Sequence, residues 1–326
     1  MNLRQFDRRK FGTLLAAGMV APWVRAEEFP SRPVRIVVGF PPGGPTDMMT
    51  REIAGALQDR WKQAVVTENK PGAASLPAVE QLIRSPADGY TLMLATDTPI
   101  VVLPFLRQKL PYDPLADIKP VAIVGAIPLI LVASAASGFK TFSEFVTAAK
   151  ARPGALDYAS NGIGAGLHIA MERMQRAAGI ELNHIPYKGS GDALPALVGG
   201  QVPVMWDTIP SSLPLIRSGK LIPLAVGGLE RVSLLPDVPC MPELGYPGFD
   251  VGLWMGLVAR SGTPAAILEK IEGDVLAAQQ NKSFVERVAA RGFERRTAGM
   301  AEFAKRIQED YARNKALFAQ LKIKKD

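Results

Sequence analysis

Short apolar runs, glycine-rich turns and amphipathic helices follow one another in this chain, and this order restricts its fold more than any other feature. Residues 33–40 form a β-rich run that ends at the turn 41–45, after which an apolar residue recurs every fourth position from 49 to 61. That spacing predicts a helix with one apolar stripe. Further strands are expected at 65–67 and 90–95. Strands that alternate with helices predict an α/β fold, with a parallel sheet and helices on its faces.

The second half of the chain repeats this order. Strands are expected at 156–159, 182–185 and 202–206, each followed by a helix, and a further apolar strand at 251–258 precedes a helical C-terminal tail. At 326 residues the chain is long enough for two domains. We therefore expect a second α/β unit that forms a domain of its own.

The first 26 residues have the features of an export signal. Four basic residues between positions 4 and 10 precede the apolar stretch 11–24, and Val24-Arg25-Ala26 resembles an A-x-A cleavage site. A stretch of about 14 apolar residues is too short to span a bilayer, so a signal cleaved after Ala26 is favoured over a membrane anchor. The pair Arg8-Arg9 also resembles a twin-arginine signal, which leaves the export route open.

Charge and composition exclude several classes of protein. The export signal holds five basic residues and one acidic residue, which leaves 33 basic against 30 acidic residues and a net charge of +3. That balance is too small for a nucleic-acid-binding surface. One cysteine, Cys240, excludes an internal disulfide and a cysteine metal cluster, and two histidines argue against a histidine metal site. Neither a metal nor a cofactor is expected.

The start of the mature chain bears on localisation. A lipoprotein would need a cysteine there, and Glu27 stands in that place. We therefore expect a freely diffusing protein, which an outer membrane would retain in a Gram-negative periplasm.

Three loops have one form: a strand ends, glycines follow and a helix begins. They are Phe40–Asp47, Ser160–Gly166 and Tyr187–Asp192. Helix N-termini leave backbone N–H groups unpaired and carry partial positive charge, and glycine lets a ligand approach them closely. Ligands of open α/β sheets bind beyond the carboxyl ends of the strands, so these loops predict an anion-binding site. No phosphate-binding loop or nucleophile-elbow motif occurs.

Single residues of these loops allow more than one interpretation. His168 could donate a hydrogen bond to a ligand or only pack, whereas His184 in a strand is expected to pack. Lys188 is the one cation of the three loops and is a candidate anion ligand. Asp47 could bind a ligand amine or complement the helix dipole. A serine, such as Ser160, with a histidine leaves a hydrolase as an alternative.

Several segments together resemble one family, the Bug (TctC-like) receptors, which are the periplasmic solute-binding subunits of tripartite tricarboxylate transporters. The segments are Phe40-Pro-Pro-Gly-Gly-Pro-Thr-Asp47, Asp88-Gly-Tyr-Thr-Leu92, Pro186-Tyr-Lys-Gly-Ser190, Gly199-Gly-Gln201, Leu235-Pro-Asp-Val-Pro239, Glu243-Leu-Gly245 and Trp254. The resemblance covers the whole mature chain from about residue 29. It implies a type II periplasmic binding protein, with two α/β domains joined by crossing hinge strands and a ligand cleft between them. It also implies carboxylate ligands held by loop backbone and bridging waters.

The sequence departs from the family pattern at two places. Pro71-Gly-Ala-Ala-Ser-Leu76 stands where the family usually has Pro-Gly-Ala-Gly-Gly-Asn, and Cys240 replaces a usual threonine. The first change alters the first-domain half of the site. The residues that we expect to bind the ligand are Phe40, Gly43, Gly44, Thr46, Asp47, Ala73, Ser160, Asn161, Gly164, His168, Lys188, Gly189, Ser190 and Asp207.

The expected protein is a monomeric periplasmic receptor, without enzymatic activity, that passes a small carboxylate to transporter membrane subunits. A dicarboxylate is favoured and an aromatic acid is a further option, while delivery to a sensor kinase is an alternative role. After the signal, 1–26, we expect domain one at 27–126 plus 250–326 and domain two at 127–249. Proline and glycine near 125–128 and 247–251 suit the hinge.

Overall fold

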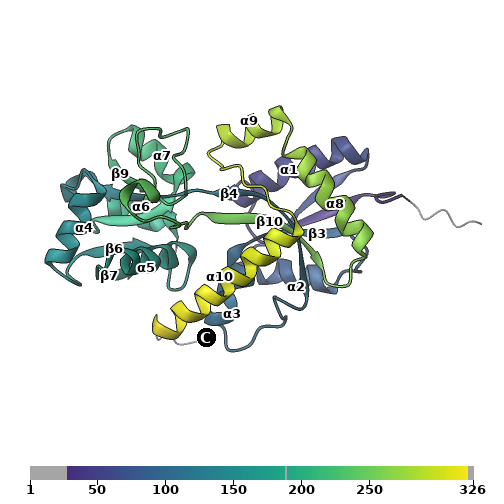
Figure 1. Cartoon of the computed structure of the whole chain (residues 1–326), viewed down its shortest axis with the longest axis horizontal. Coiled ribbons are helices and arrows are strands. Elements are labelled where there is room, and N and C mark those ends of the chain that lie inside the picture. The colour runs from purple at the N-terminus through teal and green to yellow at the C-terminus, as the bar shows by residue number, and fades with distance from the viewer. Residues whose placement is uncertain (1–27, 188, 322–326) are drawn as a thin grey trace, which may run out of the picture.

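Two five-stranded sheets lie side by side along the long axis of the molecule, each with helices packed around it (Figure 1). The structure is a computed structural model and describes residues 28–187 and 189–321. The expected export signal lies outside these residues. Within them, no helix combines the length and the apolar character that crossing a membrane requires.

The first sheet has the strand order β2-β1-β3-β10-β4. Its strands are β1 (Val34–Val38), β2 (Val65–Asn69), β3 (Thr91–Thr96), β4 (Ile118–Ile127) and β10 (Leu253–Arg260). The strands β1, β2 and β3 are parallel, whereas β10 is antiparallel to both β3 and β4. The helices that go with this sheet are α1 (Pro45–Trp61), α2 (Leu76–Arg84), α3 (Leu103–Leu106), α8 (Ala265–Ala278), α9 (Lys282–Ala290) and α10 (Met300–Leu321).

The second sheet has the order β7-β6-β8-β5-β9. Its strands are β5 (Leu129–Ser134), β6 (Asp157–Ser160), β7 (Asn183–Pro186), β8 (Val204–Thr208) and β9 (Leu221–Val226), and its helices are α4 (Phe142–Ala151), α5 (Gly166–Ala178), α6 (Ser190–Val198) and α7 (Ile209–Arg217). Here β5 is antiparallel to its neighbours β8 and β9. The parallel arrangement expected for strands that alternate with helices holds for β1, β2 and β3 and for β6, β7 and β8, whereas β5 and β10 are antiparallel to their neighbours. Each sheet contains a strand that enters from the other lobe, and its direction is set by that crossing.

The predicted apolar stripes form the cores. Met49, Ile53 and Leu57 of α1 are fully buried against the first sheet, as the four-residue spacing requires. In the second lobe, residues 129–133 of β5 are fully buried and pack with Trp206. The aliphatic and aromatic contacts of each sheet thus give each lobe a hydrophobic core of its own.

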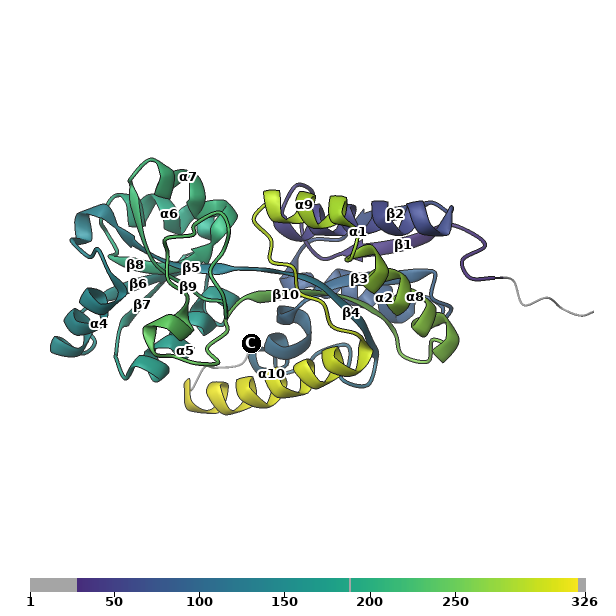
Figure 2. The same cartoon turned by 45° about the horizontal axis from the view of Figure 1, so that its top comes forward.

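Two segments connect the lobes (Figure 2). Pro128 separates β4 in the first sheet from β5 in the second. The chain returns where Val251 donates its backbone N–H to Gly227 at 2.9 Å, two residues before β10 begins. A further segment, within the first lobe, was not anticipated: residues 294–298 run beside β4 and form bridges to Ala126 and Ile123. The domain division 27–126 plus 250–326 and 127–249 stays a prediction from the sequence.

Candidate ligand-binding site

The carboxyl ends of parallel strands bring the predicted loops together within each lobe. In the first lobe β1 and β3 are neighbours, and β1 leads into α1. In the second lobe β7, β6 and β8 are neighbours, and they lead into α6, α5 and α7. Four helix N-termini therefore follow the strand ends at which ligands of α/β proteins bind.

The two lobes touch at these loops. A Cβ atom placed on Gly164, in the loop between β6 and α5, would lie 2.5 and 2.7 Å from the δ-carbons of Leu106. Leu106 belongs to α3 of the first lobe. The absence of a side chain at Gly164 therefore permits direct contact between the lobes beside the predicted site.

Asp47 holds the first glycine loop in shape. Its carboxylate accepts the backbone N–H of Gly43 at 2.9 Å, the Nδ2 of Asn69 at 2.9 Å, and two bonds from the guanidinium of Arg51 at 2.9 and 3.0 Å. These hydrogen bonds, with the charge of Arg51, more than offset the burial of the carboxylate, so its pKa lies below the ordinary value. Asp47 is fully engaged inside the protein, and so is the N–H of Gly43, which was expected to face a ligand.

Other first-lobe candidates lie at the start of α1. Gly44 is its N-cap, and Pro45 is its first residue. Thr46 is buried in the first turn, and Phe40 is half-buried and accepts the Asn69 Nδ2 at its carbonyl at 3.0 Å. Of these positions, Thr46 lies in the first helical turn, whose N–H groups have no partner within the helix.

The altered loop keeps a glycine-like backbone without glycine. Ala73–Ser75 forms a short 3₁₀ turn in which Ala74 has φ +56° and Ser75 has φ +73°. Both residues replace glycines of the family pattern, and both are in the left-handed region that disfavours a Cβ atom. The Ser75 hydroxyl donates to the Gly39 carbonyl at 3.3 Å, and its Cβ atom would overlap any side chain at Gly39. The substitution is thus accommodated by the glycine that it packs against.

The end of β3 was missed in the sequence. Thr96 is buried and its hydroxyl is without a hydrogen-bond partner among the described residues. Asp97 follows it, and burial together with repulsion from Asp310 raises the pKa of its carboxyl to about 6. No glycine follows this strand, so the pattern that identified the other loops, glycines between a strand and a helix, did not find it.

Two histidines and a tyrosine form a stack under the second-lobe loops. The ring centroids of His168 and His184 lie 4.1 Å apart, and those of His184 and Tyr158 lie 4.8 Å apart. The Gly164 N–H donates to Nδ1 of His168 at 2.8 Å. His168 therefore positions the glycine loop, because the nitrogen that faces the loop already accepts a bond.

Ser160 and His184 form a close pair whose nucleophile is not accessible. The Ser160 Oγ lies 2.6 Å from Nε2 of His184, accepts the Gly162 N–H at 3.1 Å, and is completely buried. Burial lowers the pKa of both histidines to about 4, so both rings are neutral near pH 7. The sequence suggested that His184 only packs. In the structure it also holds the Ser160 side chain through a hydrogen bond. A buried hydroxyl cannot reach a substrate, so this arrangement supports a structural role.

Asp207 is a second loop-shaping carboxylate. Ser190 and Ser212 donate their hydroxyls to its two oxygens at 2.7 and 2.6 Å. The side chain is fully buried, and burial raises the pKa of its carboxyl. Ser190 is the first residue of α6, so the pair fixes the start of that helix to β8.

Asn161 and Gly189 remain candidates for contact with a ligand. The Oδ1 atom of Asn161 is buried without a partner in the part of the chain that the structure describes. Such an atom calls for a ligand or a water molecule. Gly189 caps α6 with extended backbone, and a Cβ atom placed there would meet no other atom within 4 Å. Lys188 lies outside the described residues, and Ala73 contributes its backbone to the short turn before α2.

Comparisons with known proteins agree with this architecture. The sequence model of the tripartite tricarboxylate transporter family receptor, TctC, matches residues 49–323. Protein BugT of Bordetella pertussis is 39% identical over 280 residues, which cover 86% of each chain. The R. palustris protein Rpa4515, solved with adipate, has a TM-score of 0.75 at 30% identity and covers 89% of this chain and 97% of its own. MatC from Rhodopseudomonas palustris, with bound malate, has a TM-score of 0.71 at 32% identity and covers 89% and 100%.

These matches confirm the expected fold, with two mixed α/β lobes of the periplasmic binding type. They also confirm the expectation that the chain is a binding protein and not an enzyme. The family model covers most of the chain, and the segments that carry the resemblance lie in the loops described above. The chain belongs to the TctC family, the periplasmic solute-binding receptors of tripartite tricarboxylate transporters.

Proposed function

We propose that this receptor captures a small dicarboxylate between its two lobes and delivers it to the membrane subunits of a tripartite transporter. The observation that carries the proposal is the gathering of four helix N-termini, three of them preceded by a glycine loop, at the strand ends of both lobes. Helix N-termini favour bound carboxylates. Two similar structures were solved with adipate and with malate, which are both dicarboxylates.

The anion is held mainly by backbone in this proposal. Arg51 is the arginine nearest to the glycine loops in the sequence, and its guanidinium is bound to Asp47. Ligand contacts are therefore assigned to Thr46, Asn161, Gly189 and Lys188, with the hydroxyl of Thr96 added. The residues that position these loops are Asp47, Ser160, His168, Ser190 and Asp207.

Capture requires that the lobes close. Contacts from both lobes reach one small ligand only in a closed form, so the ligand favours that form. The hinge consists of the segment around Pro128 and the return at residues 250–252. The receptor acts as a monomer after its signal is cleaved behind Ala26. Both statements can be tested on protein from a periplasmic fraction. The mass of the denatured chain reports cleavage after Ala26, and the mass of the native protein reports whether it is a monomer.

Calorimetry with adipate and malate tests the capture model. Lys188→Ala should weaken binding by roughly 10- to 150-fold, the range of one charge-assisted hydrogen bond. Gly189→Val should weaken it more, because the added side chain enters open space in front of the α6 N-terminus and adopts the extended backbone without strain.

Matched variants lie outside the site. Lys220→Ala removes an exposed lysine, and Gly273→Val adds a side chain where a Cβ atom meets nothing within 4 Å. Both should bind as the unaltered protein does. Loss of binding in Lys188→Ala together with normal binding in Gly189→Val would show that backbone capture is wrong. Binding of neither acid, nor of any other dicarboxylate, would contradict the substrate class.

A further inference from the structure

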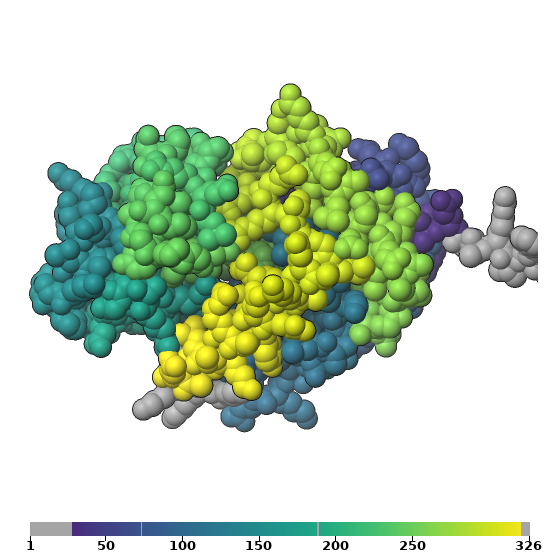
Figure 3. Space-filling model, in the orientation of Figure 1, coloured from purple at the N-terminus to yellow at the C-terminus, as the bar shows by residue number. Residues whose placement is uncertain are grey.

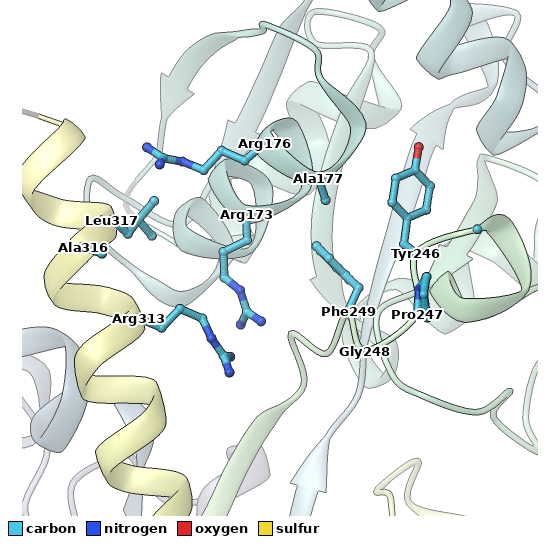
Figure 4. Close-up of a pocket in the computed structure, with 11 residues that line it drawn as sticks. Arg173, Arg176, Ala177, Tyr246, Pro247, Gly248, Phe249, Arg313, Ala316 and Leu317 are labelled. Carbon is cyan, nitrogen blue, oxygen red and sulfur yellow. The ribbon is translucent and has the colours of Figure 1, made fainter.

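A pocket lies between the lobes, beside α5 and α10, and three arginines line it (Figure 4). Its walls are α5, the segment 245–249 and α10, and its volume is about 610 Å³. Arg173 and Arg176 come from α5, and Arg313 comes from α10. None of the residues expected to bind the dicarboxylate lines this pocket. On the surface, α10 runs diagonally across the front of the molecule (Figure 3).

The positive charge of this pocket is not balanced by its walls. No aspartate or glutamate is among its lining residues. Arg313 forms an ion pair with Asp310 at 3.1 Å, and that carboxylate also binds Arg306 at 2.7 Å and the indole N–H of Trp254 at 3.1 Å. Asp310 is therefore fully occupied by its existing donors.

Arg173 has no such carboxylate. Among the described residues it forms no ion pair, and its guanidinium lies 5.7 Å from the ring centroid of Phe249. Burial and repulsion from Arg313 lower the pKa of Arg173 to about 10, and the more distant carboxylates of Asp310 and Asp250 offset this only in part. Arg176 contacts the neutral amide of Gln320. In Figure 4 the side chains of Arg173 and Arg313 extend toward each other from facing helices.

The floor of the pocket is apolar. Phe249 and Leu317 are buried there, and Pro247 and Ala316 complete that surface. A pocket of this volume is within the range that binds small organic molecules. Guanidinium groups pair with carboxylate or phosphate in a forked geometry. The complementary ligand thus has one anionic oxyacid group and an apolar body.

We propose that the pocket formed by Arg173, Arg176 and Arg313 is a second binding site, which takes an organic anion with a carboxylate or phosphate group. The anion would contact α5 of the second lobe and α10 of the first lobe at the same time. The site shares no residue with the glycine-loop site, so a variant at one site leaves the direct contacts of the other in place.

Calorimetry with phenyl phosphate and benzoate tests the site and distinguishes its two oxyacid classes. Arg173→Gln and Arg313→Gln should each weaken binding of the preferred probe by roughly 10-fold or more. Arg152→Gln, an exposed arginine at the end of α4, should leave binding unchanged. Gly189→Val, which blocks the dicarboxylate, should also bind the probe normally.

Circular dichroism and urea unfolding show whether each variant is folded. Should Arg173→Gln fail to fold, Arg176→Ala tests the same pocket at an exposed side chain. The proposal is wrong if neither probe binds at about 10 mM, where a Kd of about 1 mM would be mostly saturated. It is also wrong if the arginine variants bind as the unaltered protein does, or if binding depends on Gly189 instead. In those cases Arg173 is a structural cation only.

Discussion

Replacing Gly164 by alanine tests the contact between the lobes. Gly164 has φ +72°, and a Cβ atom would lie 2.5 and 2.7 Å from the δ-carbons of Leu106. The left-handed backbone costs a residue with a Cβ atom about 1–2 kcal/mol. Displacement of the Leu106 side chain from its rotamer costs about 0.5–1.5 kcal/mol more. The lower entropy of the unfolded alanine chain offsets about 0.4–1 kcal/mol. We expect Gly164→Ala to lower the free energy of unfolding by about 1–2.5 kcal/mol.

A matched glycine separates the two causes. Gly179, at the end of α5, has φ +62°, but a Cβ atom there meets nothing within 4 Å. Gly179→Ala should therefore show the backbone cost alone. In a chain that carries Leu106→Ala, the cost of Gly164→Ala should fall to that of Gly179→Ala, because the overlapping atoms are gone.

Urea unfolding of these variants at constant pH measures the differences. The proposed contact between α3 and the loop at Gly164 is refuted if Gly164→Ala costs no more than Gly179→Ala. It is also refuted if Leu106→Ala leaves the cost of Gly164→Ala unchanged. Dicarboxylate affinity should fall in Gly164→Ala and not in Gly179→Ala, since only Gly164 lies in a loop that borders the predicted site.

Three further outcomes are expected. Lowering the pH from 7 to 4 should reduce the free energy of unfolding by up to about 3 kcal/mol through His168: its pKa is about 4 when folded and 6.5 ordinarily, so the unfolded chain binds the proton first. In His168→Asn, whose Oδ1 can still accept the Gly164 N–H, the urea midpoint should fall less between pH 7 and pH 4. An equal fall of the midpoint in the variant and the unaltered protein would contradict this. Ala74→Gly should stabilise the protein by about 0.5–1 kcal/mol, because φ is +56° there; thermal or urea unfolding without a gain would disprove the strain. X-ray scattering should give a smaller radius with saturating dicarboxylate, and identical radii would count against closure.

Local pattern was enough to predict the elements that build the site. The helix after the first glycine loop follows from the spacing of Met49, Ile53 and Leu57, which are all buried in the structure. The three loops follow from glycines placed between a strand and a helix. These features depend on residues that are close in sequence, and neighbouring residues are what a sequence pattern reports.

The direction in which polar side chains point was not predictable. Asp47, Ser160 and His168 were candidates to contact a ligand, but their polar atoms bind the protein itself. Asp47 reaches Asn69, which is 22 residues away, and Ser160 reaches His184, which is 24 residues away. Such partners are chosen by strand pairing, so the same residue types serve as loop supports or as ligand contacts according to the tertiary neighbours.

By itself the sequence determined the two α/β lobes, the glycine loops and the membership of a receptor family, because each is recorded in local periodicity or in contiguous motifs. Tertiary structure alone decided that β10 is antiparallel to β3, that residues 294–298 run beside β4, and that Arg173 faces Arg313. These arrangements join segments far apart in the chain. The direction of a strand that crosses between lobes depends on the lobe from which it enters. The partner of a buried charge depends on which segment packs against it in the folded chain.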